Sequence, residues 1–364
     1  MATAGTDIVT TGNDSLEGSA LYIYPIKSLR GISLRHALLT PQGLAHDRRF
    51  MLREVQADVT RRNMACYHDP IMVRFIPTFA ASDGSSVVSD LDADSFSVKF
   101  LPIDGSDEKE ILIPLVPDTS ALQHAEIAMH GSATMGYNMG GRYNQWFSEC
   151  FGKKVELIYV GTNRRKAFGN LSPNTTLPSS TGIEATLSNA FFRAVGGSGD
   201  QENQTSEHEQ GLGLSDVAAV LVVNETSLNH VTETLPTGLK GHITKFRPNI
   251  VVSGARDEFV EDFWREITIR GQRVLLTQNC NRCVSLNLDF DNGGFAEGEA
   301  GKVVARLSKT RRVDPGAKYS PVFGRYGFPD KEAHGKTVSV GDVVVVTSRN
   351  EERTQFYWPF KVPL

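Results

Sequence analysis

Short aromatic or β-branched segments dominate the start of the chain and predict strands. Residues 21–26 form one such run, and the proline inside it favours an edge strand or a bulge. Residues 34–40 and 50–54 predict two further strands, with turn chemistry at 41–44 between them. We therefore expect a β meander over the first fifty residues.

Similar patterns continue along the chain, with a few short helices between the strands. Further strands are predicted at 95–100, 111–116, 155–160, 217–223, 250–254, 267–269, 274–276, 284–289 and 338–347, with a turn at 291–294. Helical spacing predicts helices at 146–151, ended by Gly152, at 227–235, with Ser227 near its start, and at 259–264. Residues 196–213 are almost devoid of apolar side chains and predict a flexible surface loop. This pattern favours a β-barrel or a mixed α+β protein over a doubly wound sheet.

Composition is typical of a soluble globular protein of about two domains. The 364 residues are 40% hydrophobic and 22% charged, with a net charge of -4. The negative net charge argues against a protein that binds nucleic acid through a basic face. Four cysteines are too few for a disulfide scaffold, the N-terminus lacks the form of a secretory signal, and no segment approaches the ~20 apolar residues of a spanning helix. We expect an intracellular protein, cytoplasmic or mitochondrion-associated, that is not secreted and has no integral membrane segment.

Cys280 and Cys283 point most directly to chemistry. Arg282 lies between them and polar residues surround them, so the segment is not typical of cysteines in an apolar core. A nearby cation also favours the thiolate that metals bind. A structural zinc site would need four ligands, and a second suitably spaced pair is missing. A thioredoxin-type pair opens a helix, whereas the residues after Cys283 alternate like a strand. A thiolate-held metal cofactor is the favoured interpretation.

Cationic and polar residues form a second group, spread widely along the chain. Arg binds phosphate in a bidentate manner, Lys supplies a point charge, and Ser and Asn give directional hydrogen bonds, so together they suit an anionic ligand rich in hydrogen-bonding groups. The group consists of Lys27, Ser28, Asp47, Arg48, Arg247 and Asn249. The sequence alone does not show whether these residues converge on the cysteines.

Six motifs in one order resemble the MOSC proteins, most closely the mitochondrial amidoxime-reducing component family, over about residues 20–348. They are the segments 24–28, 43–48, 246–249, 282–283, 320–326 and 340–342. The resemblance implies an α+β, mainly β fold, with a MOSC β-barrel domain and an N-terminal MOSC-associated domain of α/β character. We expect the N-terminal domain at 18–165, with the first strands, 20–55, as candidates to join the barrel. A flexible connecting region would follow at 166–213 and the MOSC domain at 214–350.

The resemblance also implies a molybdenum cofactor, molybdenum bound to molybdopterin, with Cys283 as the protein ligand of the metal. Arg282 would act beside it. The positions implied to hold the phosphate and pterin are Lys27, Ser28, Arg48, Arg247, Asn249, Asn281 and Tyr326. Asn281 departs from the serine of relatives, and Val217 and Ala218 replace small hydroxyl residues, so only backbone contacts would survive there. Cys280 is expected to be a packed neighbour.

The implied enzyme is a molybdenum-dependent N-reductase. It would convert N-hydroxylated small molecules, such as amidoximes, hydroxylamines and N-hydroxy bases, to amidines or amines and water. Its expected electron donors are cytochrome b5 and NADH-cytochrome b5 reductase. Three alternatives stay open: a sulfur carrier with persulfide on a cysteine, a non-catalytic carrier of the cofactor, and a binding module with zinc or a bare thiol.

Overall fold

A closed β-barrel forms one lobe of the molecule. The computed structural model describes residues 15–87, 89–167, 211–236 and 241–357. An eight-stranded sheet runs in the order β14-β13-β19-β16-β15-β21-β1-β2, and an additional β14–β1 pairing closes it into a ring. Its strands are β1 (Leu16–Ile23), β2 (Ile32–Leu34), β13 (Val220–Asn224), β14 (Ile250–Ser253), β15 (Trp264–Ile269), β16 (Gln272–Asn281), β19 (Val322–Pro329) and β21 (Val343–Arg349).

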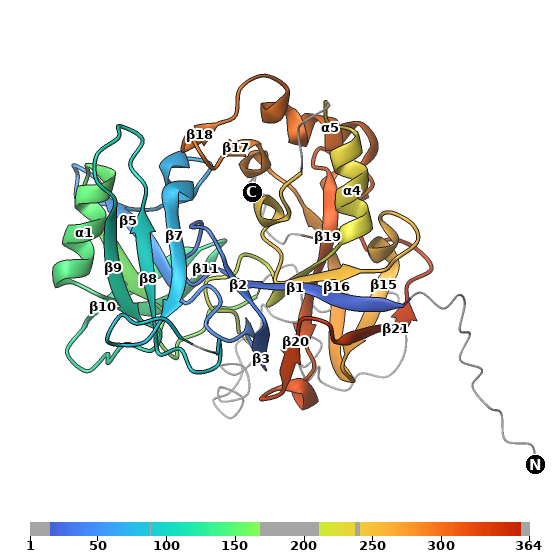
Figure 1. Ribbon diagram of the computed structural model, residues 1–364, viewed down its shortest axis with the longest axis horizontal. Coiled ribbons are helices and arrows are strands. Elements are labelled where there is room, and N and C mark those ends of the chain that lie inside the picture. Colours follow the sequence, from blue (N-terminus) through green and yellow to red (C-terminus); the bar gives the residue numbers. More distant parts are fainter. Residues whose placement is uncertain (1–14, 88, 168–210, 237–240, 358–364) are drawn as a thin grey trace, which may run out of the picture.

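The second lobe lies beside the barrel and is built from chain between about residues 50 and 160 (Figure 1). A five-stranded sheet contains β5 (Phe50–Val55), β6 (Arg61–Asn63), β10 (Gln123–Met129), β11 (Ser132–Asn138) and β12 (Val155–Tyr159). A three-stranded sheet contains β7 (Phe75–Ala80), β8 (Ser95–Phe100) and β9 (Lys109–Pro114). Helix α1 (Gly141–Phe151) covers this lobe from outside.

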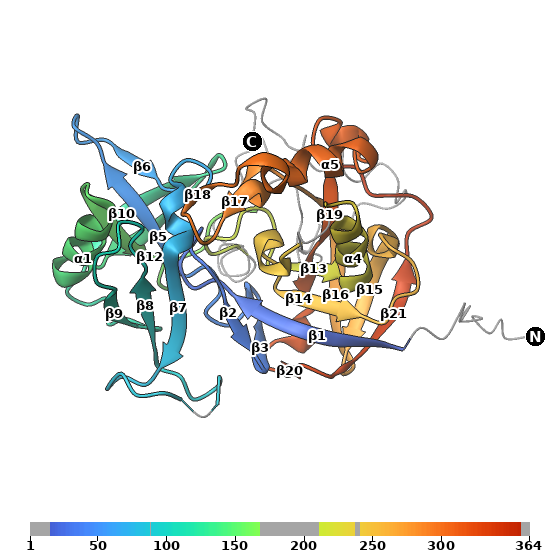
Figure 2. The same cartoon turned by 45° about the horizontal axis from the view of Figure 1, so that its top comes forward.

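Shorter elements complete the fold. Helices α4 (Glu225–Glu233) and α5 (Val303–Thr310) lie outside the barrel, as Figure 2 shows. The remaining strands are β3 (His36–Thr40), β4 (Gly43–Leu44), β17 (Leu288–Asp289), β18 (Gly294–Phe295) and β20 (Thr337–Ser339). Single 3-10 turns are η1 (Pro70–Arg74), η3 (Ile243–Phe246), η4 (Val260–Phe263), η5 (Val284–Asn287), η6 (Gly298–Lys302), η7 (Pro315–Ala317) and η8 (Lys331–Ala333).

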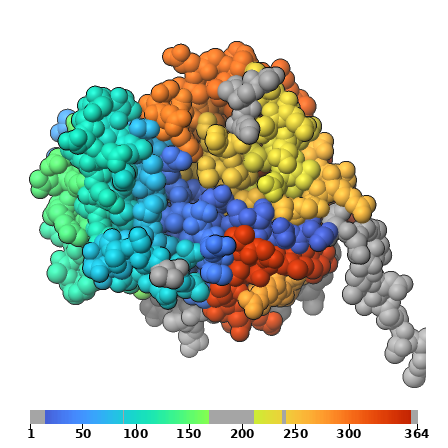
Figure 3. All heavy atoms as spheres, in the orientation of Figure 1, coloured from blue at the N-terminus to red at the C-terminus, as the bar shows by residue number. Residues whose placement is uncertain are grey.

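One apolar core joins the two lobes. Buried Leu21 and Ile267 from the barrel belong to the same cluster as Phe75 and Phe147 from the other lobe. The N-terminal segment lies between the lobes in the space-filling view (Figure 3). Because the core is continuous, residues near its junction can reach one site from either lobe.

The mainly β fold class is confirmed, and several elements match their predictions. Helix α1 ends at Gly152, whose φ of 63° is the left-handed cap conformation that glycine favours. Strands β8, β15 and β16 cover the segments expected to form them, β9, β12, β13 and β14 overlap theirs, and the turn at 291–294 connects β17 to β18. The predicted loop at 196–213 lies outside the described residues except for its end.

Other local predictions are wrong, mostly because long-range pairing overrides sequence neighbourhood. Strand β1 lies inside the barrel between β14 and β21 and ends before Pro25, so it is no edge strand. The first fifty residues form no meander, since β1, β3 and β5 belong to three different sheets. The segment predicted as the last strand divides into β20 and β21.

The ends of two predicted helices and the segment after the cysteine pair also differ. Helix α4 begins at Glu225, two residues before the predicted start, so Ser227 does lie near its beginning; Asn224 caps it by accepting a hydrogen bond from the Thr226 amide. The apolar residues at 259–264 make only the 3-10 turn η4 before β15 begins. Residues 284–289 form the 3-10 turn η5 and the two-residue strand β17 instead of one strand. No strand directly follows Cys283, so the predicted strand does not exclude a thioredoxin-type cysteine pair. Such a pair opens an α-helix, however, and the segment after Cys283 is a single 3-10 turn.

Candidate functional site

The chain leaves β1 into a turn that carries two of the predicted ligand-binding residues, Lys27 and Ser28. Ser28 has left-handed backbone at φ 69°, and so do two predicted ligand-binding residues of other segments, Arg48 at φ 47° and Arg247 at φ 55°. Non-glycine residues adopt this conformation at a cost and concentrate at functional sites. Three such residues in one predicted site mark a local geometry that the surrounding structure imposes.

Arg48 and Arg247 flank the ring of Tyr24. Their guanidinium carbons lie 4.7 Å and 4.2 Å from the ring centroid. Arg48 donates to the buried Asp47 carboxylate at 2.5 Å and to Asn249 Oδ1 at 3.1 Å. Arg247 Nη1 donates to the Leu29 carbonyl at 2.6 Å. The arrangement holds two cations side by side, and among the described residues Asp47 is the carboxylate that bonds directly to one of them, Arg48.

Burial and charge shape the ionisation of this group. Burial, together with the neighbouring Arg48, lowers the pKa of Arg247. Burial also opposes the charge of Arg48, but Asp47 outweighs it and the pKa of Arg48 is raised. Burial lowers the pKa of Lys27 despite its ion pair with Asp216. Desolvation therefore works against the charges of Arg247 and Lys27, and an anionic ligand would offset it.

Cys283 lies at the end of β16, where the barrel strand passes into η5. Its thiol is exposed and lies 3.2 Å from the Ser285 hydroxyl. Arg282 turns inward instead: its guanidinium donates to the Cys280 sulfur at 3.0 Å and to the Phe246 carbonyl at 2.7 Å. Arg282 thereby joins the cysteine segment to the residue directly before Arg247.

Asn281 and Tyr326 lie on the neighbouring strands β16 and β19. Burial, and after it Cys280 and Asp216, raises the pKa of Tyr326, so its phenol stays protonated. Both amide atoms of Asn281 are buried and have no partner among the described residues, and the same holds for the hydroxyl of fully buried Tyr24. Buried polar groups without partners are rare, so these atoms favour a bound, hydrogen-bonding ligand.

The two predicted groups of residues meet at Cys66, which sequence reasoning missed. Burial raises the pKa of the Cys66 thiol, while Arg247 and Lys27 act in the opposite direction and Cys283 adds to the increase. The Ser28 side chain forms a hydrogen bond with the same thiol. We call the surroundings of Cys66 and Cys283 the cationic cup; it contains Lys27, Ser28, Arg48, Arg247, Asn249, Asn281, Arg282 and Tyr326.

Asp216 and His130 are further residues that the sequence did not single out. Asp216 pairs with Lys27, and the same carboxylate oxygen lies 2.9 Å from His130 Nε2. These residues come from three distant segments, and no local pattern connects them. A lysine that follows an apolar run, as Lys27 does, gives no signal of a carboxylate partner so far along the chain.

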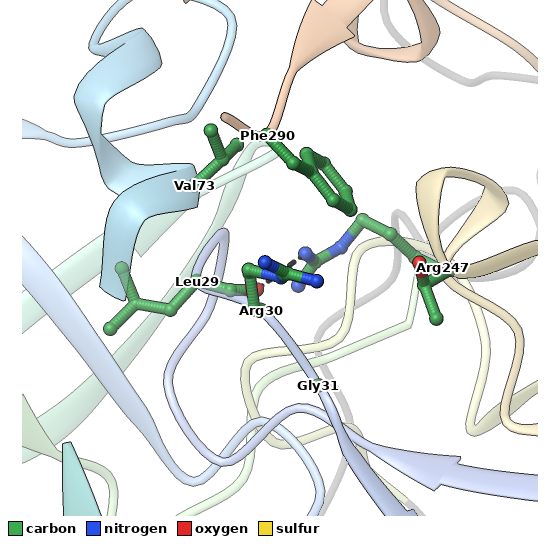
Figure 4. Close-up of a pocket in the computed structure, with 7 residues that line it drawn as sticks. Leu29, Arg30, Gly31, Val73, Arg247 and Phe290 are labelled. Atoms are coloured by element: carbon green, nitrogen blue, oxygen red, sulfur yellow. Dashed lines mark hydrogen bonds between the residues drawn. The ribbon is translucent and has the colours of Figure 1, made fainter. Parts of the chain in front are cut away.

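A small cavity of about 40 Å³ adjoins the cup between the lobes. Leu29, Arg30, Gly31, Val73, Thr244, Arg247 and Phe290 line it, and Figure 4 shows the Arg30 and Arg247 side chains converging there. Arg30 lies over the Phe290 ring, 4.6 Å from its centroid. Arg247 therefore belongs to both the cup and this cavity.

The donor set of the cup fits an anionic cofactor with one protein thiolate. Four cations, one exposed thiol and unpartnered amide and hydroxyl groups surround it, and no group of three His, Cys, Asp or Glu side chains gathers as a metal site in the part of the chain described. Such a set suits a metal whose other ligands come from an organic group. None of the described helices is long and apolar enough to cross a membrane.

A β-barrel with a cationic cup and an exposed thiol at the end of a barrel strand defines a protein built to bind an anionic group beside a sulfur ligand. The chain matches the MOSC domain over residues 209–345 and the MOSC N-terminal beta barrel domain over residues 17–154. Together these matches cover most of the chain, which belongs to the MOSC-domain proteins.

Individual relatives are distant. The chain is 25% identical to the human "Mitochondrial amidoxime-reducing component 1" over 335 residues. The aligned region covers 89% of this chain and 81% of that relative. It is 21% identical over 300 residues to the rice "Molybdenum cofactor sulfurase", covering 80% of this chain but only 30% of that relative. The human "Molybdenum cofactor sulfurase" is similar at 23% identity over 80% of this chain and 28% of its own length.

Proposed function

We propose that this protein is a molybdenum-cofactor-dependent oxidoreductase that reduces N-hydroxylated small molecules to amidines or amines and water. The observation that carries the proposal is the convergence of Lys27, Ser28 and Arg247 with Cys283 around one buried thiol. Similarity to the amidoxime-reducing component over 89% of the chain supports the same reaction class.

In this proposal, residues of the chain bind and orient the molybdenum cofactor. Cys283 offers the sulfur ligand for molybdenum, and Arg282 keeps positive charge directly behind it. Lys27, Ser28, Arg48, Arg247 and Asn249 hold the phosphate and pterin, while Asn281 and Tyr326 supply hydrogen bonds from the barrel strands. When bound, the molybdenum cofactor supplies the redox chemistry that the polypeptide lacks.

Electrons must come from outside the chain in this scheme. We propose cytochrome b5, with NADH-cytochrome b5 reductase, as the donor system, and an intracellular site of action. Exposure of Cys283 is compatible with electron delivery near the surface, since short distances favour transfer. A reconstituted chain of the two proteins with NADH tests the donor separately from the reaction.

The test of the central proposal combines metal analysis with turnover. Purified protein should contain molybdenum and should reduce benzamidoxime to benzamidine when a chemical reductant supplies electrons. Cys283→Ala should lose turnover while the fold is kept. Cys150→Ala is the matched control, because that thiol lies on α1 in the other lobe and burial raises its pKa to about 12. Full turnover in Cys283→Ala would refute the metal-ligand role.

A sulfur carrier is the second candidate, and similarity to the sulfurases over 80% of the chain favours it. In that case an exposed thiol such as Cys283 would hold a persulfide. Mass spectrometry distinguishes the two: an additional sulfur on Cys283 in protein without molybdenum supports the carrier, and molybdenum with benzamidoxime reduction supports the enzyme.

A further inference from the structure

Asp216 joins three segments that are far apart in the sequence. It precedes β13, Lys27 follows β1, and His130 lies in the turn between β10 and β11. One oxygen, Asp216 Oδ1, contacts both Lys27 Nζ and His130 Nε2, the latter at 2.9 Å. The Asp216 carbonyl also accepts from Arg165 Nη2 at 2.7 Å, which fixes its backbone. The carboxylate therefore connects the cup to the second lobe.

The reaction proposed above consumes protons. Breaking the N–O bond with two electrons from the external donor uses two protons: one ends on the nitrogen, and the other joins the departing oxygen to form water. Most groups of the cup are poor proton donors. The guanidinium groups of Arg48, Arg247 and Arg282 hold their protons permanently. Burial raises the pKa of Tyr326 and of the Cys66 thiol, so these groups also retain theirs.

We propose that the protons enter through His130 and Asp216 and reach the cationic cup on the Lys27 ammonium group. This inference rests on the proposed function. Lys27 releases a proton inward, Asp216 Oδ1 passes on a proton from the His130 imidazolium, and His130 takes another from water. Two proton transfers accompany the two electrons, so each N–O bond broken yields one water molecule.

Exposure and electrostatics support this direction of transfer. The Lys27 side chain is 14% exposed, while those of His130 and Asp216 are 27% and 51% exposed, so water reaches the outer pair more easily. Burial opposes ionisation of Asp216, but Lys27 and His130 outweigh it and hold its pKa well below the usual range while Lys27 is charged. Release of the Lys27 proton removes the larger of these two positive charges, so the Asp216 oxygen then accepts a proton from His130 more readily. Burial lowers the pKa of Lys27, which eases proton release. Other charged or titratable groups facing this junction are Arg48, Arg165, Tyr67 and Tyr326.

The first test uses molybdenum-loaded protein with benzamidoxime and a chemical reductant between pH 6 and pH 8.5. We expect His130→Gln to keep its molybdenum but to lose roughly ten- to hundredfold in turnover at the alkaline end, with partial rescue by added imidazole. His124→Gln is the matched control, because His124 is an exposed histidine on β10 packed on Tyr137. Its pH profile should follow that of the wild type.

Other outcomes would overturn the inference. Wild-type turnover and pH profile in fully loaded His130→Gln would exclude His130 from proton entry. Loss of activity that only follows loss of molybdenum would show a structural role instead. Absence of benzamidoxime reduction by loaded wild-type protein would refute the proposed function, a result separable from either of these.

A second readout needs no turnover. In cofactor-free protein, nitrogen NMR should show His130 Nε2 protonated and hydrogen-bonded, and Asp216→Ala should change the Nε2 chemical shift because the oxygen that contacts this atom is removed. An unchanged His130 Nε2 signal in Asp216→Ala would exclude the His130–Asp216 pair as a proton path.

Discussion

Single residues in the cup are held by contacts that local sequence does not specify. Ser28, Arg48 and Arg247 keep left-handed backbone, a conformation that costs about 1–3 kcal/mol for residues other than glycine. For Arg48 and Arg247, stacking on Tyr24 and buried hydrogen bonds offset this cost. The side chains are thereby oriented before any ligand binds, which reduces the ordering cost of binding.

Glu261, outside the cup, is the residue whose burial has the clearest consequence for stability. It is completely buried on η4, and one of its oxygens accepts from the Ser227 hydroxyl at 2.9 Å. Burial, followed by the adjacent Asp262, raises the pKa of Glu261 from 4.5 to about 7. Folding therefore favours the protonated acid.

This raised pKa predicts a specific pH dependence of stability. The contribution of Glu261 is fully present below pH 4.5 and is lost as pH rises through about 7, by up to about 3 kcal/mol. Glu261→Gln keeps a hydrogen-bonding amide without the charge, so the variant should unfold at higher urea than wild type at pH 8 but not at pH 5. Glu352→Gln, at an exposed position, should show no such difference. Equal urea midpoints at pH 8 would contradict the raised pKa.

At the scale of elements, the end of α1 follows directly from a glycine. Gly152 has φ 63°, and a Cβ built there would meet no atom within 4 Å. Any cost of adding a side chain is therefore conformational and not steric.

Gly152→Ala should lower the free energy of unfolding by about 1 kcal/mol, because alanine adopts this left-handed conformation poorly. Gly294→Ala is the control: its surroundings are equally open, but its φ is not positive. Urea unfolding of both variants measures the difference. Equal stabilities would mean that the helix end relaxes without strain.

The segment after Cys283 shows where element prediction fails. Leu286 and Leu288 are buried, as the alternating pattern requires, but Val284 is exposed because residues 284–287 form a 3-10 turn. A short alternating run constrains which side chains are buried but not the path of the backbone. Here β16 ends at Asn281, and the chain turns away from the barrel while Cys283 stays exposed.

At the scale of the whole molecule, β1 is the strand that closes the barrel. It pairs with β14 on one side and β21 on the other, although almost two hundred residues separate it from β13. Its residues Leu21 and Ile23 are buried in the shared core. The barrel thus uses a strand from the N-terminal family match together with those of the MOSC match.

This topology predicts that residues 209–357 alone will not fold cooperatively. Without β1, the edges of β14 and β21 are unpaired and part of the core is missing. Joining residues 15–40 to this fragment through a flexible linker should restore a cooperative urea transition in near-ultraviolet circular dichroism. A linker-bearing fragment with residues 15–40 in scrambled order is the control. A cooperative transition in the fragment alone would show that β1 is dispensable.

Much of the architecture could be read along the chain because strand alternation, turn residues and helix caps are local signals. The same holds for the chemical types in the cup: Cys283, Arg282 and the cationic and amide residues stand in motifs that indicate an anionic ligand beside a thiolate. Their assigned roles stay predictions. What local patterns could not indicate was which strands pair, as the misplaced edge strand at residues 21–26 shows.

Contacts across space were decided only by folding. Cys66, Asp216 and His130 carry no local signature, yet they join the cup because three separate segments meet there. Burial and electrostatic interaction depend on distance through the folded molecule and not along the chain, so Glu261 and Lys27 change their ionisation only once their neighbours are in place. The sequence determines which chemical groups the site contains. The tertiary structure, through the closed barrel and its junction with the second lobe, determines which of these groups lie close together and which are buried.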